Sequence, residues 1–180
     1  MESKHLEQFF EYITAQNIEV YNEFSLQHEL GIFLRTTLPQ YKIQFERNVS
    51  YFGISETVKK EIDISIVGDK DRYAVELKYP TNGQYPEQLY SFVKDIKFME
   101  QLKEQGFSKT FSVALVGDRP FYEGRDNSGI YDFFRESRIV RGRIYKPTGQ
   151  LKNSGFIEIA GEYPISWRLL GDRRYFIVEI

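Results

Sequence analysis

The chain has 180 residues, of which 41% are hydrophobic and 16% aromatic, a composition that predicts one globular domain with a substantial core. The formal net charge of −2 excludes binding of nucleic acid through bulk positive charge. The absence of cysteine excludes a disulfide scaffold, a thiolate zinc site and a cysteine nucleophile, and two histidines are too few for a three-histidine metal site.

Apolar residues recur at helical spacing in the first part of the chain and at alternate positions after that. A long helical segment ends at Gly106, which suits a helix C-terminus. The expected elements, in chain order, are helices at 3–16 and 23–37, strands at 41–52, 60–67 and 72–78, a helix at 84–105, a strand at 109–117, a short helix at 128–136, and strands at 138–146, 155–160 and 174–180.

This order of elements predicts an α/β protein. We expect a central mixed four-stranded sheet flanked by helices, with the order α-β-β-β-α-β over about residues 23–117. The step from strand 72–78 to strand 109–117 should be a parallel crossover. Residues 118–180 are expected to form an additional C-terminal β-rich elaboration of the same single domain, 1–180, because no linker is visible.

Nothing in the sequence indicates a membrane or secreted protein. No apolar run approaches the roughly 20 residues that cross a bilayer. The first residues, MESKHLEQFF, lack the basic-then-apolar order of a signal peptide. We therefore expect a cytoplasmic protein with no membrane partner.

Acidic side chains fall on the polar faces of two neighbouring strands. Side chains alternate along a strand, so Asp63 shares a face with Ser65, and Glu76 shares a face with Lys78. The short turn between the strands allows Asp63, Glu76 and Lys78 to face the same side of the sheet. Neighbouring carboxylates repel each other unless a cation binds between them, and their hard oxygens suit Mg²⁺ or Mn²⁺. The alternative is a solvated sheet face with a cross-strand ion pair.

A further carboxylate comes from the second helix. Glu29 lies three residues after Leu26 and four before Phe33, so it leans toward the apolar stripe of that helix. A buried carboxylate is costly without a partner, and a metal site on the sheet would provide one. A position at the surface or at the helix end is the alternative.

The spacing of these residues resembles that of the PD-(D/E)xK nuclease superfamily, whose core has the order α-β-β-β-α-β. The resemblance covers a little over half of the chain. It implies that the side chains of Asp63 and Glu76 and the backbone carbonyl of Leu77 bind the metal. It implies that Glu29 binds the metal directly or through water. It also implies that the lysine orients or activates water. The motif consists of Asp63, twelve intervening residues, then Glu76, Leu77 and Lys78, with Glu29 on the preceding helix.

The sequence departs from the motif at one position and offers two further polar residues near the expected site. Ile62 stands before Asp63 where the motif has proline, a difference that many members share. Gln88 and Asp95 interrupt the apolar stripe of the long helix. Some members of the superfamily place a glutamine on this helix, so Gln88 could hydrogen-bond a metal-bound water or a phosphate. Asp95 could orient Lys78 or an arginine, and for both residues the alternative is a buried polar group satisfied by the backbone.

A concentrated basic stretch lies near the C-terminal end of the chain. Alternate positions 141, 143 and 145 would share one strand face, which suits phosphate contacts beside a stacking aromatic ring. A solvated basic face is the alternative. The candidate nucleic-acid-binding residues are Arg138, Arg141, Arg143 and Lys146.

The sequence therefore predicts a metal-dependent nuclease that hydrolyses phosphodiester bonds of nucleic acid, with DNA as the expected substrate and Mg²⁺ or Mn²⁺ as the cofactor. The alternative is a non-catalytic or partner-dependent nucleic-acid-binding module that keeps the nuclease fold. The lack of net positive charge favours dependence on a partner protein, and a homodimer is the other assembly that we consider. A carboxylate cluster without a metal, in a structural protein, is a third interpretation.

Overall fold

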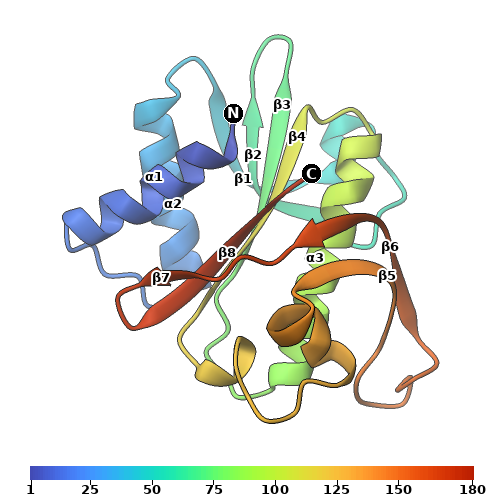
Figure 1. The fold of residues 1–180 in the computed structure, drawn as a ribbon. Helices are drawn as coiled ribbons and strands as arrows, with labels where there is room; N and C mark the ends of the chain where they lie inside the picture. Colours follow the sequence, from blue (N-terminus) through green and yellow to red (C-terminus); the bar gives the residue numbers. More distant parts are fainter.

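The computed structural model describes residues 1–180 and has a mixed α/β architecture (Figure 1). The predicted order of elements, α-β-β-β-α-β, and the predicted parallel crossover are both present. The main elements are α1 (Ser3–Ala15), α2 (Glu23–Thr37), β1 (Lys42–Asn48), β2 (Glu61–Val67), β3 (Arg72–Lys78), α3 (Tyr85–Glu104), β4 (Lys109–Val116), β5 (Ile139–Tyr145), β6 (Phe156–Pro164), β7 (Arg168–Leu170) and β8 (Arg173–Glu179).

The main sheet has six strands in the order β1-β2-β3-β4-β8-β7. Strands β3 and β4 are parallel, and every other neighbouring pair is antiparallel. The predicted four-stranded mixed sheet is thus extended by β8 and β7 from the C-terminal part of the chain. Strands β5 and β6 form a separate antiparallel hairpin.

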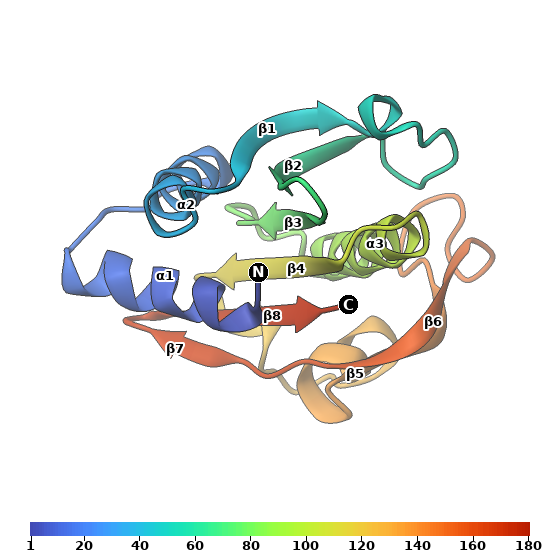
Figure 2. The same ribbon diagram turned by 90° about the horizontal axis from the view of Figure 1, so that it is seen from above.

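The molecule has three layers. Helices α1 and α2 lie on one face of the sheet, and α3 with the β5–β6 hairpin lies on the other (Figure 2). Leu26 and Leu30 of α2 pack with Ile64 and Val75 in a core cluster of 21 buried residues. Two further clusters, of 15 and 8 buried residues, fill the other side of the sheet, under α3 and the β5–β6 hairpin.

The start of α2 is fixed by reciprocal capping. The N–H of Ser25 donates to Oδ1 of Asn22 at 2.8 Å, and the N–H of Asn22 donates to Oγ of Ser25 at 3.0 Å. These bonds satisfy donors that a helix N-terminus otherwise leaves unpaired. The cap places Glu23 in the first turn, where the helix dipole favours a negative charge.

The packing of α2 against β1 depends on a glycine. A Cβ atom at Gly31 would lie 2.1 Å from Cζ of Phe45, which is too close for any side chain. The glycine therefore allows the Phe45 ring to approach the helix backbone. This contact holds β1 close to the C-terminal half of α2.

Two predicted elements differ in form. The strand expected at 41–52 ends at Asn48, because Oδ1 of Asn48 accepts the N–H of Ser50 at 3.0 Å and starts a 3₁₀ turn. The helix expected at 128–136 is a 3₁₀ turn followed by one π-helical turn. No helix combines the length and the apolar character that crossing a membrane requires.

The hairpin is anchored to α3 by one buried carboxylate. Oε1 of Glu100 accepts the N–H groups of Ala160 at 2.9 Å and Gly161 at 2.8 Å, and the hydroxyl of Tyr163 at 3.1 Å. Its other oxygen pairs with Lys97 at 2.9 Å. Glu100 thus joins two segments that are about sixty residues apart in the sequence.

Candidate active site

Strands β2 and β3 separate at Asp63 and Glu76. Their pairing runs from Val67 opposite Arg72 to Ile64 opposite Val75. Beyond that point the N–H of Leu77 donates to Oδ2 of Asp63 at 2.7 Å, and the N–H of Asp63 donates to Oε1 of Glu76 at 3.2 Å. Carboxylates therefore accept the hydrogen bonds of these backbone groups, and both side chains are fixed where the strands part.

The two carboxyl groups are shielded from water to different degrees. Glu76 is 1% exposed, and Asp63 is half-buried. Burial raises the pKa of Asp63 to about 6, although the charge of Lys59 and the hydrogen bond from Leu77 oppose the change. Burial also raises the pKa of Glu76 well above its usual range, and the negative charges of Asp63 and Asp95 add to that effect.

The cation beside these carboxylates is Lys59, from the segment that leads into β2. Its Nζ atom makes ion pairs with Oε2 of Glu76 and with Oδ1 of Asp95, the latter at 2.9 Å. Burial opposes the charge of Lys59, but the carboxylates of Asp95 and Glu76 outweigh it and raise the pKa of the ammonium. Oδ2 of Asp95 is buried and has no hydrogen-bond partner.

Lys59 is not among the residues that the sequence pattern predicts for the site. The signal was its position, because Lys59 lies four residues before Asp63 and continues the same alternating series. Asp95 was identified only as a residue that could orient Lys78 or an arginine. Its partner in the structure is Lys59.

Lys78 lies at the end of β3 and is held by the start of α2. Its Nζ atom is 3.0 Å from Oε1 of Glu23, and the N–H of Tyr79 donates to the other oxygen of Glu23 at 3.1 Å. Burial opposes the charge of Lys78, but the carboxylates of Asp95 and Glu23 raise its pKa above the ordinary value. Lys78 is therefore charged, and its charge in turn lowers the pKa of Asp63.

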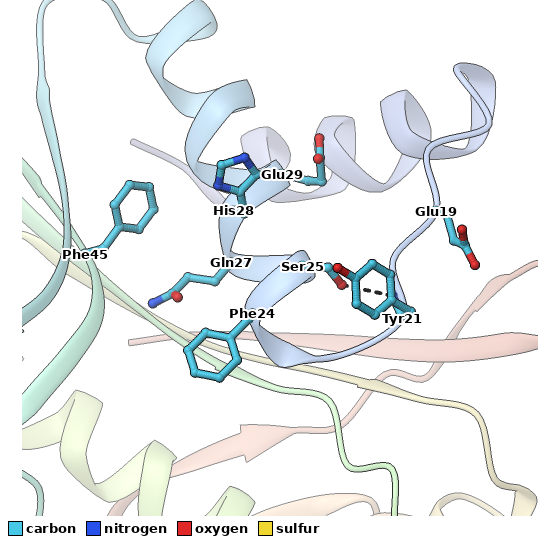
Figure 3. Close-up of a pocket in the computed structure, with 8 residues that line it drawn as sticks. All are labelled: Glu19, Tyr21, Phe24, Ser25, Gln27, His28, Glu29 and Phe45. Atoms are coloured by element: carbon cyan, nitrogen blue, oxygen red, sulfur yellow. Dashed lines mark hydrogen bonds between the residues drawn. The ribbon is translucent and has the colours of Figure 1, made fainter.

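The helix carboxylate at the site is Glu23 and not Glu29, the residue that the apolar pattern of the helix predicts. Glu29 makes no ion pair or hydrogen bond, and its carboxylate points away from Gln27 and Phe24 in Figure 3. The buried stripe of α2 includes Leu26 and Leu30.

Glu23 and Gln27 are four residues apart and lie on the same face of α2. Nε2 of Gln27 donates to Oε1 of Glu46 at 2.6 Å and to the carbonyl oxygen of Asp63 at 2.8 Å. Glu23 and Gln27, and not Glu29, are therefore the polar side chains of α2 that reach Lys78 and Asp63.

Asp63 is reached from the surface through a small hollow between α2 and β1. The hollow has a volume of about 160 Å³, and Asp63 and Leu77 lie among its lining residues. An adjoining hollow of about 410 Å³ shares Phe24 and Gln27 with it (Figure 3). Phe24 is 75% exposed at the junction of the two.

The residues present fit a hard divalent cation, although they do not form a complete cage. No group of three or more acidic or histidine side chains is arranged to hold a metal ion. Asp63 and Glu76 nevertheless supply oxygen donors of the kind that Mg²⁺ and Mn²⁺ prefer. Oδ2 of Asp95 has no partner, and Glu76 already pairs with an ammonium. Both observations indicate that a cation is stabilised among these buried carboxylates.

Gln88 and the basic residues lie outside this cluster. Nε2 of Gln88 donates to Oδ1 of Asn82 at 3.1 Å, and Gln88 makes no hydrogen bond to Asp63 or Glu76. Arg138 donates to a backbone carbonyl, and the structure gives Lys146 no ion pair. Arg141 pairs with Glu162 at 2.9 Å and Arg143 with Glu158 at 3.2 Å, across the β5–β6 hairpin.

No protein-family model, no curated protein and no solved structure matches the chain. The interpretation of the site therefore rests on its geometry and chemistry.

Proposed function

We propose that the protein is a metal-dependent nuclease that hydrolyses phosphodiester bonds of nucleic acid, with DNA as the expected substrate. The observation that carries the proposal is the fixed position of Asp63 and Glu76 at the point where β2 and β3 part, with the charged Lys78 two residues beyond Glu76. Together they match the residues of a PD-(D/E)xK-type site in kind, order and strand placement.

Each residue has a defined task in this proposal. Asp63, Glu76 and the backbone carbonyl of Leu77 would hold Mg²⁺ or Mn²⁺, which when bound lowers the pKa of water and offsets phosphate charge. Glu23 keeps the Lys78 ammonium at the end of β3. From there Lys78 can orient a water molecule and stabilise the negative charge that grows on the phosphate oxygens.

The test is cleavage of labelled single- and double-stranded DNA in Mg²⁺ or Mn²⁺. We expect Asp63→Asn, Glu76→Gln and Lys78→Ala each to lower the cleavage rate by about a hundredfold or more, as expected for loss of a group that stabilises transition-state charge. Glu61→Gln and Lys94→Ala serve as matched controls, since both side chains are exposed on β2 and α3 and make no ion pair. Cleavage at the wild-type rate by Asp63→Asn or Glu76→Gln would contradict the proposal.

A second candidate is a nucleic-acid-binding module that lacks catalysis or depends on a partner protein or a second copy of the chain. It is favoured by the contacts of Lys59, which already supply positive charge to Glu76 and Asp95. This candidate predicts DNA binding without cleavage in either metal. It also predicts that Asp63→Asn leaves DNA affinity unchanged.

A further inference from the structure

A lysine ammonium lies among the carboxylates that the proposed function assigns to the metal. We infer that Lys59 is a tethered cation that competes with the divalent ion for Glu76, and that Asp95 retains the ammonium when the ion binds. This inference rests on the proposed function, because it concerns the same carboxylates. It assigns roles to Lys59 and Asp95, which the sequence motif does not include.

The first support is the geometry of the ammonium. Nζ of Lys59 contacts one oxygen of Glu76, while the other oxygen of Glu76 is engaged by the N–H of Asp63. The oxygen that is free to bind a metal is thus the one that Lys59 takes. A divalent ion and the ammonium cannot share this oxygen without strong repulsion, because both are cations in a region of low dielectric.

The second support is the spare capacity of Asp95. This residue is 2% exposed, one of its oxygens binds Lys59, and the other is buried with no partner. An ammonium has three donors, so Asp95 alone can hold Lys59 through both oxygens after the contact with Glu76 is lost. Nζ also lies 5.7 Å from the ring centroid of Phe98, which lies next to the ammonium on the side of α3.

The third support is the balance of charge. Four acids, Asp63, Glu76, Asp95 and Glu23, lie at the site, and Lys59 and Lys78 are the two cations that oppose them. Without Lys59 the acids would be buried with too little positive charge, which a folded protein tolerates poorly. The Lys59 side chain is 22% exposed, so its ammonium has a route toward solvent when a divalent ion takes its place.

The experiment measures Mn²⁺ affinity by calorimetry on the full chain, with no nucleic acid present. Lys59→Met removes the ammonium and keeps the length of the side chain. We expect this variant to bind Mn²⁺ about tenfold tighter or more. If the ammonium occupies Glu76 in about nine-tenths of the wild-type molecules, the apparent affinity of the wild type for Mn²⁺ is lowered about tenfold. Lys60→Met is the matched control, since Lys60 bonds to the carbonyl of Ser55 outside the cluster, and it should bind as the wild type does.

The double variant Lys59→Met, Asp95→Asn separates competition from net charge. It removes one positive and one negative charge, so the sum of charges at the site equals that of the wild type. It also remains informative if Lys59→Met alone fails to fold. Tighter Mn²⁺ binding by the double variant supports displacement of the ammonium, whereas wild-type affinity or weaker binding overturns it.

The outcomes distinguish this inference from the proposed function. If the wild type binds Mn²⁺ and cleaves DNA while the Lys59 variants bind with unchanged affinity, only the inference fails. If no form of the protein binds Mn²⁺, both fail. The melting temperature gives an independent readout. If Lys59 competes with the metal, Mn²⁺ should raise the melting temperature of the double variant more than that of the wild type.

Discussion

At the scale of single residues, Asp63 and Glu76 serve both the fold and the proposed chemistry. Each accepts a backbone N–H that the sheet would otherwise leave unpaired, and each has a pKa raised first by burial. The backbone bonds fix the side chains, and burial keeps water away from the oxygens of Glu76, whereas Asp63 lines the hollow between α2 and β1. A bound cation would therefore meet a preorganised pair whose charges nothing else fully offsets.

The raised pKa of Asp63 predicts a specific pH dependence of stability. Because the folded chain holds this proton more tightly than the unfolded chain, with a pKa of about 6 against the ordinary 3.8, the stabilisation is present below about pH 4 and is lost as the pH rises through about 6. The shift corresponds to about 3 kcal/mol. The amide of Asp63→Asn does not titrate, so this variant should not lose stability as the pH rises through the same interval.

The measurement is urea unfolding of both proteins with a chelator present, from about pH 4 to about pH 7. The free energy of unfolding of the wild type should fall relative to that of Asp63→Asn across this interval. A difference between the two proteins that stays constant over the interval would show that Asp63 has an ordinary pKa.

The site shows which residues a sequence pattern can identify. Asp63, Glu76 and Lys78 follow from strand alternation, because that period is fixed by backbone geometry. The choice between Glu23 and Glu29 depends on the rotation of α2 about its own axis, which the capping at Asn22 and the contact at Gly31 determine.

At the scale of elements, the hairpin depends on α3 through Glu100, which is 3% exposed. Glu100→Ala would leave two backbone N–H groups and the Tyr163 hydroxyl, all partly buried, without their acceptor. We expect a loss of about 3 kcal/mol in the free energy of unfolding, because charged acceptors form strong hydrogen bonds and unpaired donors are costly. Urea unfolding measures this loss, and Glu104→Ala, exposed on the same helix, is the control.

Hydrogen exchange provides a second readout at the same interface. The amides of Ala160 and Gly161 should exchange faster in Glu100→Ala, because their acceptor is removed. Unchanged exchange at both amides would mean that the hairpin is held by its apolar contacts alone.

The elements themselves were predictable to different degrees. Those up to β4 have long periodic patterns, so both their type and their order follow from the sequence. The strand β7 has three residues, too few to show alternation. The places of β8 and β7 at the sheet edge depend on pairing between segments that are distant in the sequence, for which a single sequence carries no local signal.

At the scale of the whole molecule, a chain of net charge −2 must bind a polyanion through a local surface. The arginines of β5 are the clustered candidates, yet Arg141 and Arg143 already have glutamate partners on β6. Exposed ion pairs of this kind contribute at most about 1 kcal/mol, so a phosphate group could replace either glutamate. The two glutamates would then act as competitors of the DNA.

Paired variants test this surface. Arg141→Ala with Arg143→Ala should weaken DNA binding and flatten the slope of log K against log salt by about two units, since each lost phosphate contact removes about 0.9. Glu158→Gln with Glu162→Gln should instead tighten binding, because it frees the same arginines. The measurement is fluorescence anisotropy of labelled DNA over a salt series, with Ca²⁺ in place of Mg²⁺ to suppress cleavage.

The control is Arg119→Ala, which breaks an exposed ion pair with Glu123 at 2.8 Å in the segment after β4. It removes the same kind of charge from another part of the surface and should change the slope by less than the loss of one phosphate contact. If the arginine and glutamate variants of the hairpin both bind as the wild type does, the hairpin does not contact DNA. Binding would then have to be sought at the hollow beside Phe24, which opens onto Asp63.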